Sequence, residues 1–154
     1  MKLATLCYVH DKEKSCTLML HRIKKANDVH EGKWNGLGGK LEPGESPEEC
    51  VIREVKEESG LTIISPTLKG FITFPMFDSV DDWYVFVFTA ENYSGVIMDS
   101  DEGVLEWIPN KKITELNLWD GDKIFMNWLN ESKFFSAKFN YLNKSLNDYS
   151  CVFY

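Results

Sequence analysis

Residues 39–61 constrain the fold more than any other stretch, because they predict a helix and the surroundings of each of its faces. Ser46 is a typical N-cap, and it is followed by a proline at the first helical position and a glutamate that closes a capping box. Gly60 provides the stop, since glycine enters the left-handed C-cap conformation without strain. We therefore expect a helix over residues 47–59.

The predicted helix has an apolar arc and an adjoining acidic arc, because successive residues are about 100° apart. The apolar arc, which can pack on a sheet, is made by Val51, Ile52 and Val55. The acidic residues, three and four positions apart, are Glu54, Glu57 and Glu58. We expect one face of the helix to be anchored in the core and the other to be available for chemistry.

An acidic arc is usually only a solvated surface, but this one is crowded. Two carboxylates about 5 Å apart at an effective dielectric near 20 repel by roughly 3 kcal/mol. Arg53 lies four residues before Glu57, so it can pair with that residue and orient the cluster. Glu45 lies just before the N-cap and can fold back toward the same cluster. Hard oxygen ligands in this density suit Mg²⁺, with Mn²⁺ as a second possibility.

The same stretch matches the pattern G-x5-E-x7-R-E-U-x-E-E-x-G-U at every position, where U is aliphatic. The matching residues are Gly39, Glu45, Arg53, Glu54, Val55, Glu57, Glu58, Gly60 and Leu61. This pattern is the signature of the Nudix hydrolases, and the chain resembles that family. The resemblance implies an α/β/α sandwich with a mixed β-sheet, a divalent cation and hydrolysis of a nucleotide diphosphate linkage.

The resemblance also implies a set of metal ligands and a general base. The expected ligands are the Gly38 carbonyl and the carboxylates of Glu54, Glu57, Glu58 and Glu102. Glu54 and Glu58 are the leading ligands, while Glu54 or Glu57 is the expected base. Glu102 lies outside the signature and is a candidate for an extra ligand or a water-orienting base, and an ordinary loop carboxylate is an equally good interpretation of it.

Three segments outside the signature resemble MutT-type enzymes that hydrolyse oxidised purine nucleoside triphosphates, the mammalian and streptococcal members above all. Residues 32–40 are similar to the segment that leads into the signature. Residues 118–122 resemble a Trp-x-Asp-Asp stretch, although Gly121 stands where the mammalian enzymes have the first aspartate. Residues 134–139 resemble the C-terminal strand. The likeness therefore extends over nearly the whole chain.

Five residues are candidates for substrate binding on this resemblance. Asn35 can exchange hydrogen bonds with a purine edge, and Trp119 can stack on the base for roughly 1–3 kcal/mol. Asp122 and Asp120 can receive protons from a guanine edge, and Thr5 corresponds to a pocket-lining residue in the mammalian relative. Turn, core and loop roles are the alternatives for Asn35, Trp119 and the two aspartates.

The expected activity is Mg²⁺-dependent hydrolysis of 8-oxo-dGTP to 8-oxo-dGMP and pyrophosphate, by attack of water at the β-phosphorus. Such an enzyme cleanses the nucleotide pool and so prevents mutation. ADP-ribose is the alternative substrate, because Pro75 lies fifteen residues beyond Gly60, an offset common in ADP-ribose hydrolases. A non-catalytic nucleotide sensor is a third hypothesis, and a degraded signature would be its mark, whereas this signature is intact.

Length and charge set the wider frame. At 154 residues we expect one domain, residues 1–154, and the net charge of −7 argues against a partner that is long DNA or RNA. No signal peptide or membrane-spanning stretch is apparent, so we expect no membrane partner. Four unpatterned cysteines are expected to be buried thiols in a reducing cytoplasm: Cys7, Cys16, Cys50 and Cys151. The sequence does not indicate an oligomeric state.

The remaining elements follow from periodicity and turn residues. We expect strands at residues 3–10, 17–22, 61–77, 83–89 and 104–108 and a closing hairpin of 134–142 with 149–153. A second helix is expected within residues 116–129. We also expect surface or loop positions for the three histidines, which are His10, His21 and His30. Strands with two interspersed helices again predict an α/β sandwich with a mixed sheet.

Overall fold

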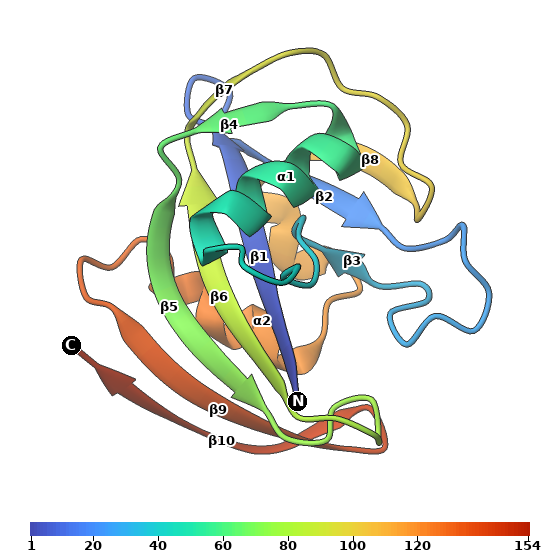
Figure 1. The fold of residues 1–154 in the computed structure, drawn as a ribbon, viewed down its shortest axis with the longest axis vertical. Helices are drawn as coiled ribbons and strands as arrows, with labels where there is room; N and C mark the ends of the chain where they lie inside the picture. The colour runs from blue at the N-terminus through green and yellow to red at the C-terminus, as the bar shows by residue number, and fades with distance from the viewer.

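A mixed eight-stranded sheet organises the chain, as seen in a computed structural model that describes residues 1–154 (Figure 1). The strand order is β10-β9-β5-β6-β1-β2-β3, and β8 pairs with β2. The strands are β1 (Lys2–Asp11), β2 (Cys16–His21), β3 (Trp34–Asn35), β5 (Thr67–Phe74), β6 (Trp83–Ala90), β8 (Val104–Pro109), β9 (Phe135–Leu142) and β10 (Ser145–Phe153). The β1–β6 and β5–β9 pairs are parallel and the others are antiparallel.

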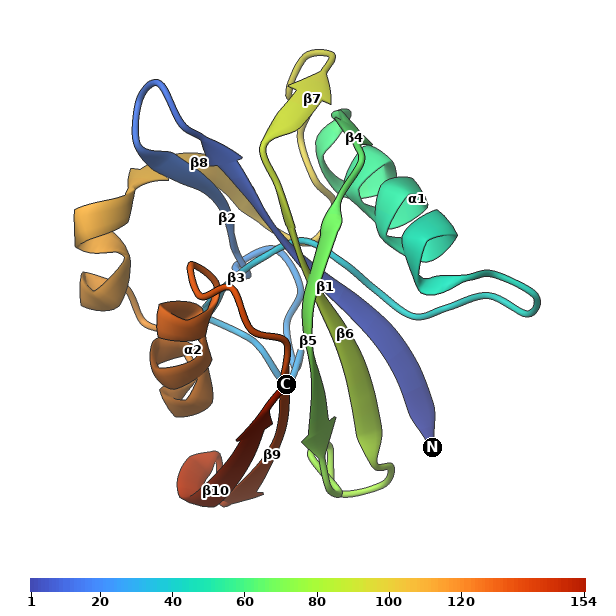
Figure 2. The same ribbon diagram turned by 90° about the vertical axis from the view of Figure 1, so that its left-hand side faces the viewer.

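Helices cover both faces of this sheet, so the predicted α/β/α sandwich is confirmed (Figure 2). One face carries α1 (Pro47–Ser59), and the opposite face carries the 3-10 helix η1 (Asn110–Glu115), α2 (Asp120–Phe125) and the 3-10 helix η2 (Met126–Trp128). Two apolar cores follow from this arrangement. Val51 and Val55 belong to the core under α1, whereas Phe125 and Phe135 belong to the core under α2.

The signature helix begins and ends where the sequence predicts. The Ser46 hydroxyl accepts from Glu49 N at 3.1 Å, and the Glu49 carboxylate accepts from Ser46 N at 2.8 Å, which completes the capping box. Gly60 has a φ of 82°, and a Cβ there would lie 2.6 Å from the Val96 carbonyl oxygen. The helix is therefore fixed at both ends by the residue types that the sequence provides.

The single strand expected over residues 61–77 is wrong. The chain turns at Ser65, whose φ is 49°, so that β4 (Thr62–Ile64) separates from β5. A small second sheet is formed by β4 and β7 (Asn92–Ser94), a strand that the sequence did not reveal. The local apolar pattern does not reveal this break, because both halves are strand-like and only their partner strands differ.

The helix expected over residues 116–129 is shorter than its apolar spacing indicates. Leu116 and Trp119 both have extended backbone, so α2 begins only at Asp120 and continues into η2. The closing hairpin is confirmed, and its turn is formed by Asn143 and Lys144, both of which have left-handed φ. The extended backbone at Trp119 allows this side chain to line a cavity.

The cysteine prediction is half correct. All four cysteines are free, and Cys7 and Cys50 are buried, but Cys16 and Cys151 are partly exposed, since Cys16 begins β2 beside an exposed turn and Cys151 lies on the edge strand β10. No helix has the length and apolar character needed to cross a membrane.

Candidate active site

One cavity of about 630 Å³ brings together residues from most of the chain. It lies against the sheet between the signature helix and the segment that carries Trp119. Seven of the residues predicted as site residues line it: Thr5, Asn35, Gly38, Glu54, Glu102, Trp119 and Asp122. The cavity therefore has an acidic end near α1 and an aromatic end near α2.

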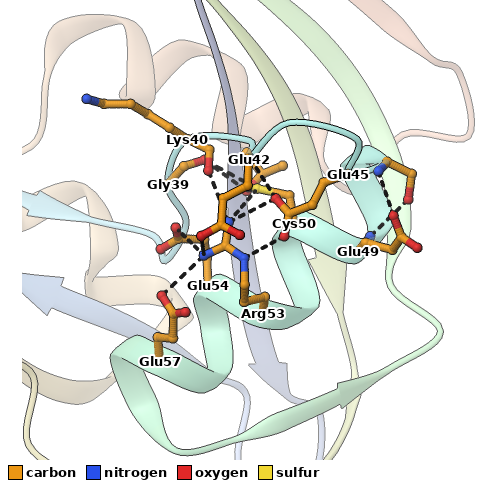
Figure 3. A network of polar contacts seen from close by, with 11 residues as sticks. Gly39, Lys40, Glu42, Glu45, Glu49, Cys50, Arg53, Glu54 and Glu57 are labelled. Carbon is orange, nitrogen blue, oxygen red and sulfur yellow. Dashed lines mark hydrogen bonds and ion pairs between the residues drawn. The ribbon is translucent and has the colours of Figure 1, made fainter.

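Arg53 organises the acidic end, as Figure 3 shows. Its Nε and Nη2 contact the Glu45 carboxylate at 2.5 and 2.9 Å, and its Nη1 lies 2.9 Å from Glu54 Oε1. The predicted pair with Glu57 is present, at 3.2 Å. Arg53 also donates to the Lys40 carbonyl at 3.1 Å, so it ties the helix to the loop that precedes it. The expected return of Glu45 to the cluster is confirmed, and Arg53 is the reason for it.

Glu58 is the buried member of the acidic arc. Its carboxylate accepts from Gly38 N at 3.2 Å, and burial followed by the nearby Glu102 charge raises its pKa to about 8. Burial also raises the pKa of Glu54. Glu57 differs, because its side chain is 57% exposed to solvent. The structure thus groups Glu54, Glu58 and Glu102, with Glu57 at the margin.

This group fits a small divalent cation in its donor chemistry. Three mutually repelling carboxylates offer hard oxygen ligands, and the Gly38 carbonyl beside them has no hydrogen-bond partner. No three acidic, histidine or cysteine side chains are already arranged around one point as a metal site. Arginines instead contact two of the carboxylates, Arg53 at Glu54 and Arg22 at Glu102. A cation would take the neutralising role that the arginines have here.

The glycines before the helix are required by close packing at the acidic end. A Cβ on Gly39 would lie 2.4 Å from the Glu54 carboxyl carbon. A Cβ on Gly38 would lie 2.0 Å from the Thr5 carbonyl oxygen, and the φ of Gly38 is 157°. The loop can therefore approach both β1 and α1 only without side chains at these two positions.

The aromatic end surrounds a few buried polar groups. Asn35, Thr5 and Asp122 are all buried, and burial raises the pKa of Asp122 to about 7 against the opposing effect of Lys33. Trp119 is 4% exposed, and its Nε1 donates to His30 Nδ1 at 2.9 Å. An amide, an indole and a carboxyl group in one apolar cavity can recognise a flat heterocycle with polar edges.

Asp120 is the one predicted substrate ligand that the structure places elsewhere. Its side chain is exposed and accepts from Leu146 N at 3.1 Å, so it ties α2 to β10 rather than lining the cavity. The first turn of α2 separates the two aspartates, since residues two apart face different sides of a helix.

Several residues of the cavity wall were not predicted from the sequence, and four of them matter most for the site. Phe77 and Tyr141 contact the Trp119 ring edge-on, at centroid distances of 4.9 and 5.5 Å. Arg22 and His30 also line the cavity, and His30 lies in a loop, one of the two positions expected for it, with its side chain partly buried. The sequence offered one signal for His30: it lies two residues before the segment 32–40, which resembles MutT-type enzymes and contains Asn35.

Comparisons with known proteins agree with this site. The NUDIX domain matches residues 1–129. An uncharacterized Nudix hydrolase of Bacillus subtilis is 43% identical over 95 residues, which are 59% of this chain and 60% of that protein, so less than two thirds of the relative is matched. An oxidized purine nucleoside triphosphate hydrolase of Danio rerio is 36% identical over 110 residues, 71% of this chain and 70% of the relative.

Among solved structures, a MutT protein from Bacillus halodurans superposes with a TM-score of 0.85 at 33% identity, covering 98% of this chain and 97% of that chain. The sheet, the helices and the intact signature at residues 39–61 agree with these matches. The chain belongs to the Nudix hydrolase family and is of the MutT type.

Proposed function

We propose that the protein hydrolyses oxidised purine nucleoside triphosphates, with 8-oxo-dGTP as the preferred substrate, in the presence of Mg²⁺. The observation that carries this proposal is the single cavity, whose acidic end and aromatic end are continuous. A triphosphate and its base need these two environments at the same time. The products are the nucleoside monophosphate and pyrophosphate. The likeness to the Danio rerio hydrolase supports the same substrate class.

The aromatic end holds the base in this proposal. Trp119 stacks on it, Asn35 hydrogen-bonds its edge and Asp122 shares a proton with it. Thr5 lines the wall near the sugar, where its hydroxyl lies 3.4 Å from the Gly39 carbonyl. Because the pKa of Asp122 is raised to about 7 by burial, this group can either donate to or accept from an oxidised purine near neutral pH.

The acidic end performs the hydrolysis. Glu54, Glu58, Glu102 and the Gly38 carbonyl would hold a Mg²⁺ or Mn²⁺ ion, which would neutralise the phosphates and polarise the phosphorus–oxygen bond. Glu54 lines the cavity whereas Glu57 is exposed at its margin, so Glu54 is the better placed of the two to take the proton of the attacking water. Arg53 holds the Glu54 carboxylate in position.

ADP-ribose is the second candidate substrate, because Pro75 lies fifteen residues beyond Gly60, the offset common in ADP-ribose hydrolases. Pro75 follows directly after β5, in the loop that also carries Phe77 of the cavity wall. A single nucleotide is the partner in either case, rather than a nucleic-acid polymer or a membrane. We place the activity in the cytoplasm, in keeping with four free cysteines. In this proposal residues 1–154 act as one domain.

A substrate panel tests the proposal. We expect kcat/KM with Mg²⁺ to be at least about tenfold higher for 8-oxo-dGTP than for dGTP, and far lower for ADP-ribose, with pyrophosphate as the released product. A preference for ADP-ribose would overturn the substrate while leaving the catalytic residues unchanged. Tight nucleotide binding without product release in Mg²⁺ or Mn²⁺ would instead indicate a sensor.

A further inference from the structure

A contact between His30 and Trp119 fixes the orientation of the indole at the aromatic end. Trp119 Nε1 donates to His30 Nδ1 at 2.9 Å, and the two rings meet edge-on, with centroids 5.7 Å apart and planes at 89°. On its other side His30 stacks on Phe77, at a centroid distance of 5.8 Å and an angle of 25°. The Lys33 ammonium lies over the indole, 4.9 Å from its centroid. Trp119 is thus restrained both at its N–H group and over its ring.

The imidazole is in the form that this contact requires. Burial, followed by the charge of Arg22, lowers the pKa of His30 to about 4, so the ring is neutral near pH 7. A neutral imidazole has one acceptor nitrogen, and the bond from Trp119 assigns that role to Nδ1. The Trp119 N–H group is consequently satisfied by the protein and is not needed by a ligand.

His30 is itself held by a polar chain that extends to the acidic end. Asp28 accepts from His30 N at 3.2 Å through Oδ1, and from Arg22 Nε at 2.9 Å through Oδ2. Arg22 Nη1 in turn lies 3.4 Å from Glu102 Oε2. Side chains of Arg22 and Asp28 are mostly buried, so their pair is sheltered from solvent. The segment that carries His30 has one defined position relative to both ends of the cavity.

We infer that His30 is a positioning residue that sets the purine preference of the cavity by presenting the face of Trp119, rather than its N–H group, to the base. This inference rests on the proposed function, in which Trp119 stacks on the nucleobase. A fixed indole face favours the larger ring system, because stacking increases with overlap. Without His30 the indole regains rotational freedom, and its N–H group must find a new acceptor. The cavity would then discriminate less well between two-ring and one-ring bases.

Two substitutions at His30 separate the hydrogen bond from the ring. His30→Phe keeps an aromatic ring against Phe77 but removes the acceptor. His30→Asn removes the ring and keeps an acceptor, because its Oδ1 lies near the position of Nδ1. We expect His30→Phe to raise KM for dGTP and 8-oxo-dGTP about fivefold, as the loss of one hydrogen bond would. The value of kcat and the KM for dCTP should change less than twofold. His30→Asn should restore the purine KM to within about twofold of the wild-type value.

His10→Asn is the matched control, since His10 bonds Thr17 outside this cavity and should leave every KM unchanged. Equal KM changes for purine and pyrimidine triphosphates, an effect confined to kcat, or a failure of His30→Asn to restore binding would each overturn the inference. If the wild-type protein hydrolyses no triphosphate, the proposed function fails separately. In that case calorimetric binding of dGMP and dCMP to the same variants tests the role of His30. An unchanged preference of His30→Phe for dGMP over dCMP would overturn it.

Discussion

The two ends of the cavity are built in different ways. Most of the acidic end comes from one continuous stretch, residues 39–61, whose helix places Glu54 and Glu58 by its own periodicity. The aromatic end is assembled from short pieces distant in sequence, among them the segments that carry His30, Phe77 and Trp119. Local periodicity is therefore enough to position the carboxylates of the proposed catalytic site, whereas the proposed recognition surface depends on how strands and loops meet.

The largest expected effect is at the acidic end. Glu58→Gln retains the acceptor for Gly38 N and the volume of the side chain, so the protein should fold normally. It removes a carboxylate that would be ionised when the proposed cation is bound, and we expect kcat at saturating Mg²⁺ to fall about 10³-fold, close to 4 kcal/mol. Steady-state assays on 8-oxo-dGTP measure this. Near-normal turnover would remove Glu58 from the proposed ligands.

Asp122→Asn is expected to change how the free energy of unfolding depends on pH. Because burial raises the pKa of Asp122 in the folded protein to about 7, from an ordinary value of 3.8, the folded state binds more protons than the unfolded state between these values. The wild-type protein should therefore lose stability as pH rises through this window, and the neutral asparagine should not. Between pH 5 and 8 the variant should gain about 3 kcal/mol relative to the wild type.

Urea unfolding of both proteins at pH 5, 6, 7 and 8 measures this difference. A free-energy difference that stays constant across the series would show that Asp122 is ionised in the folded protein throughout. The two ends of the cavity would then differ less in charge, because an ionised Asp122 would make the aromatic end acidic as well.

How much of the structure the sequence predicts also depends on whether a feature is local or joins distant parts of the chain. Ser46, Gly60 and the arcs of α1 were predictable, because capping and helical spacing are local properties. The break at Ser65 was not, since both halves are strand-like and differ only in their partners: β4 pairs with β7, whereas β5 pairs with β6 and β9. The contact of His30 with Trp119 was not predicted, because it joins positions far apart in the chain and the position of His30 indicates at most that it lies near the site.

Trp119→Leu addresses the aromatic end directly. Leucine keeps an apolar side chain in a buried position but cannot stack, so we expect KM for 8-oxo-dGTP to rise about tenfold, within the roughly 1–3 kcal/mol of a base–aromatic stack. The value of kcat should change little, because the acidic end is untouched. Trp107→Leu is the control, since Trp107 packs on Tyr93 away from the cavity. A fall in kcat with an unchanged KM for Trp119→Leu would contradict the division between the two ends.

The smallest expected effect concerns the scaffold of the acidic end. Ser46→Ala removes the hydroxyl that accepts from Glu49 N, and the loss of this N-cap should lower the free energy of unfolding by about 1 kcal/mol. Ser46→Asp should recover it, because aspartate also caps and favours the positive end of the helix. Turnover per folded molecule should stay constant, since Arg53 independently ties the helix to the Lys40 carbonyl. If kcat of Ser46→Ala is lower than that of the wild type at temperatures well below unfolding, the geometry of Glu54 and Glu58 depends on the cap. The acidic end then requires more than the periodicity of the helix.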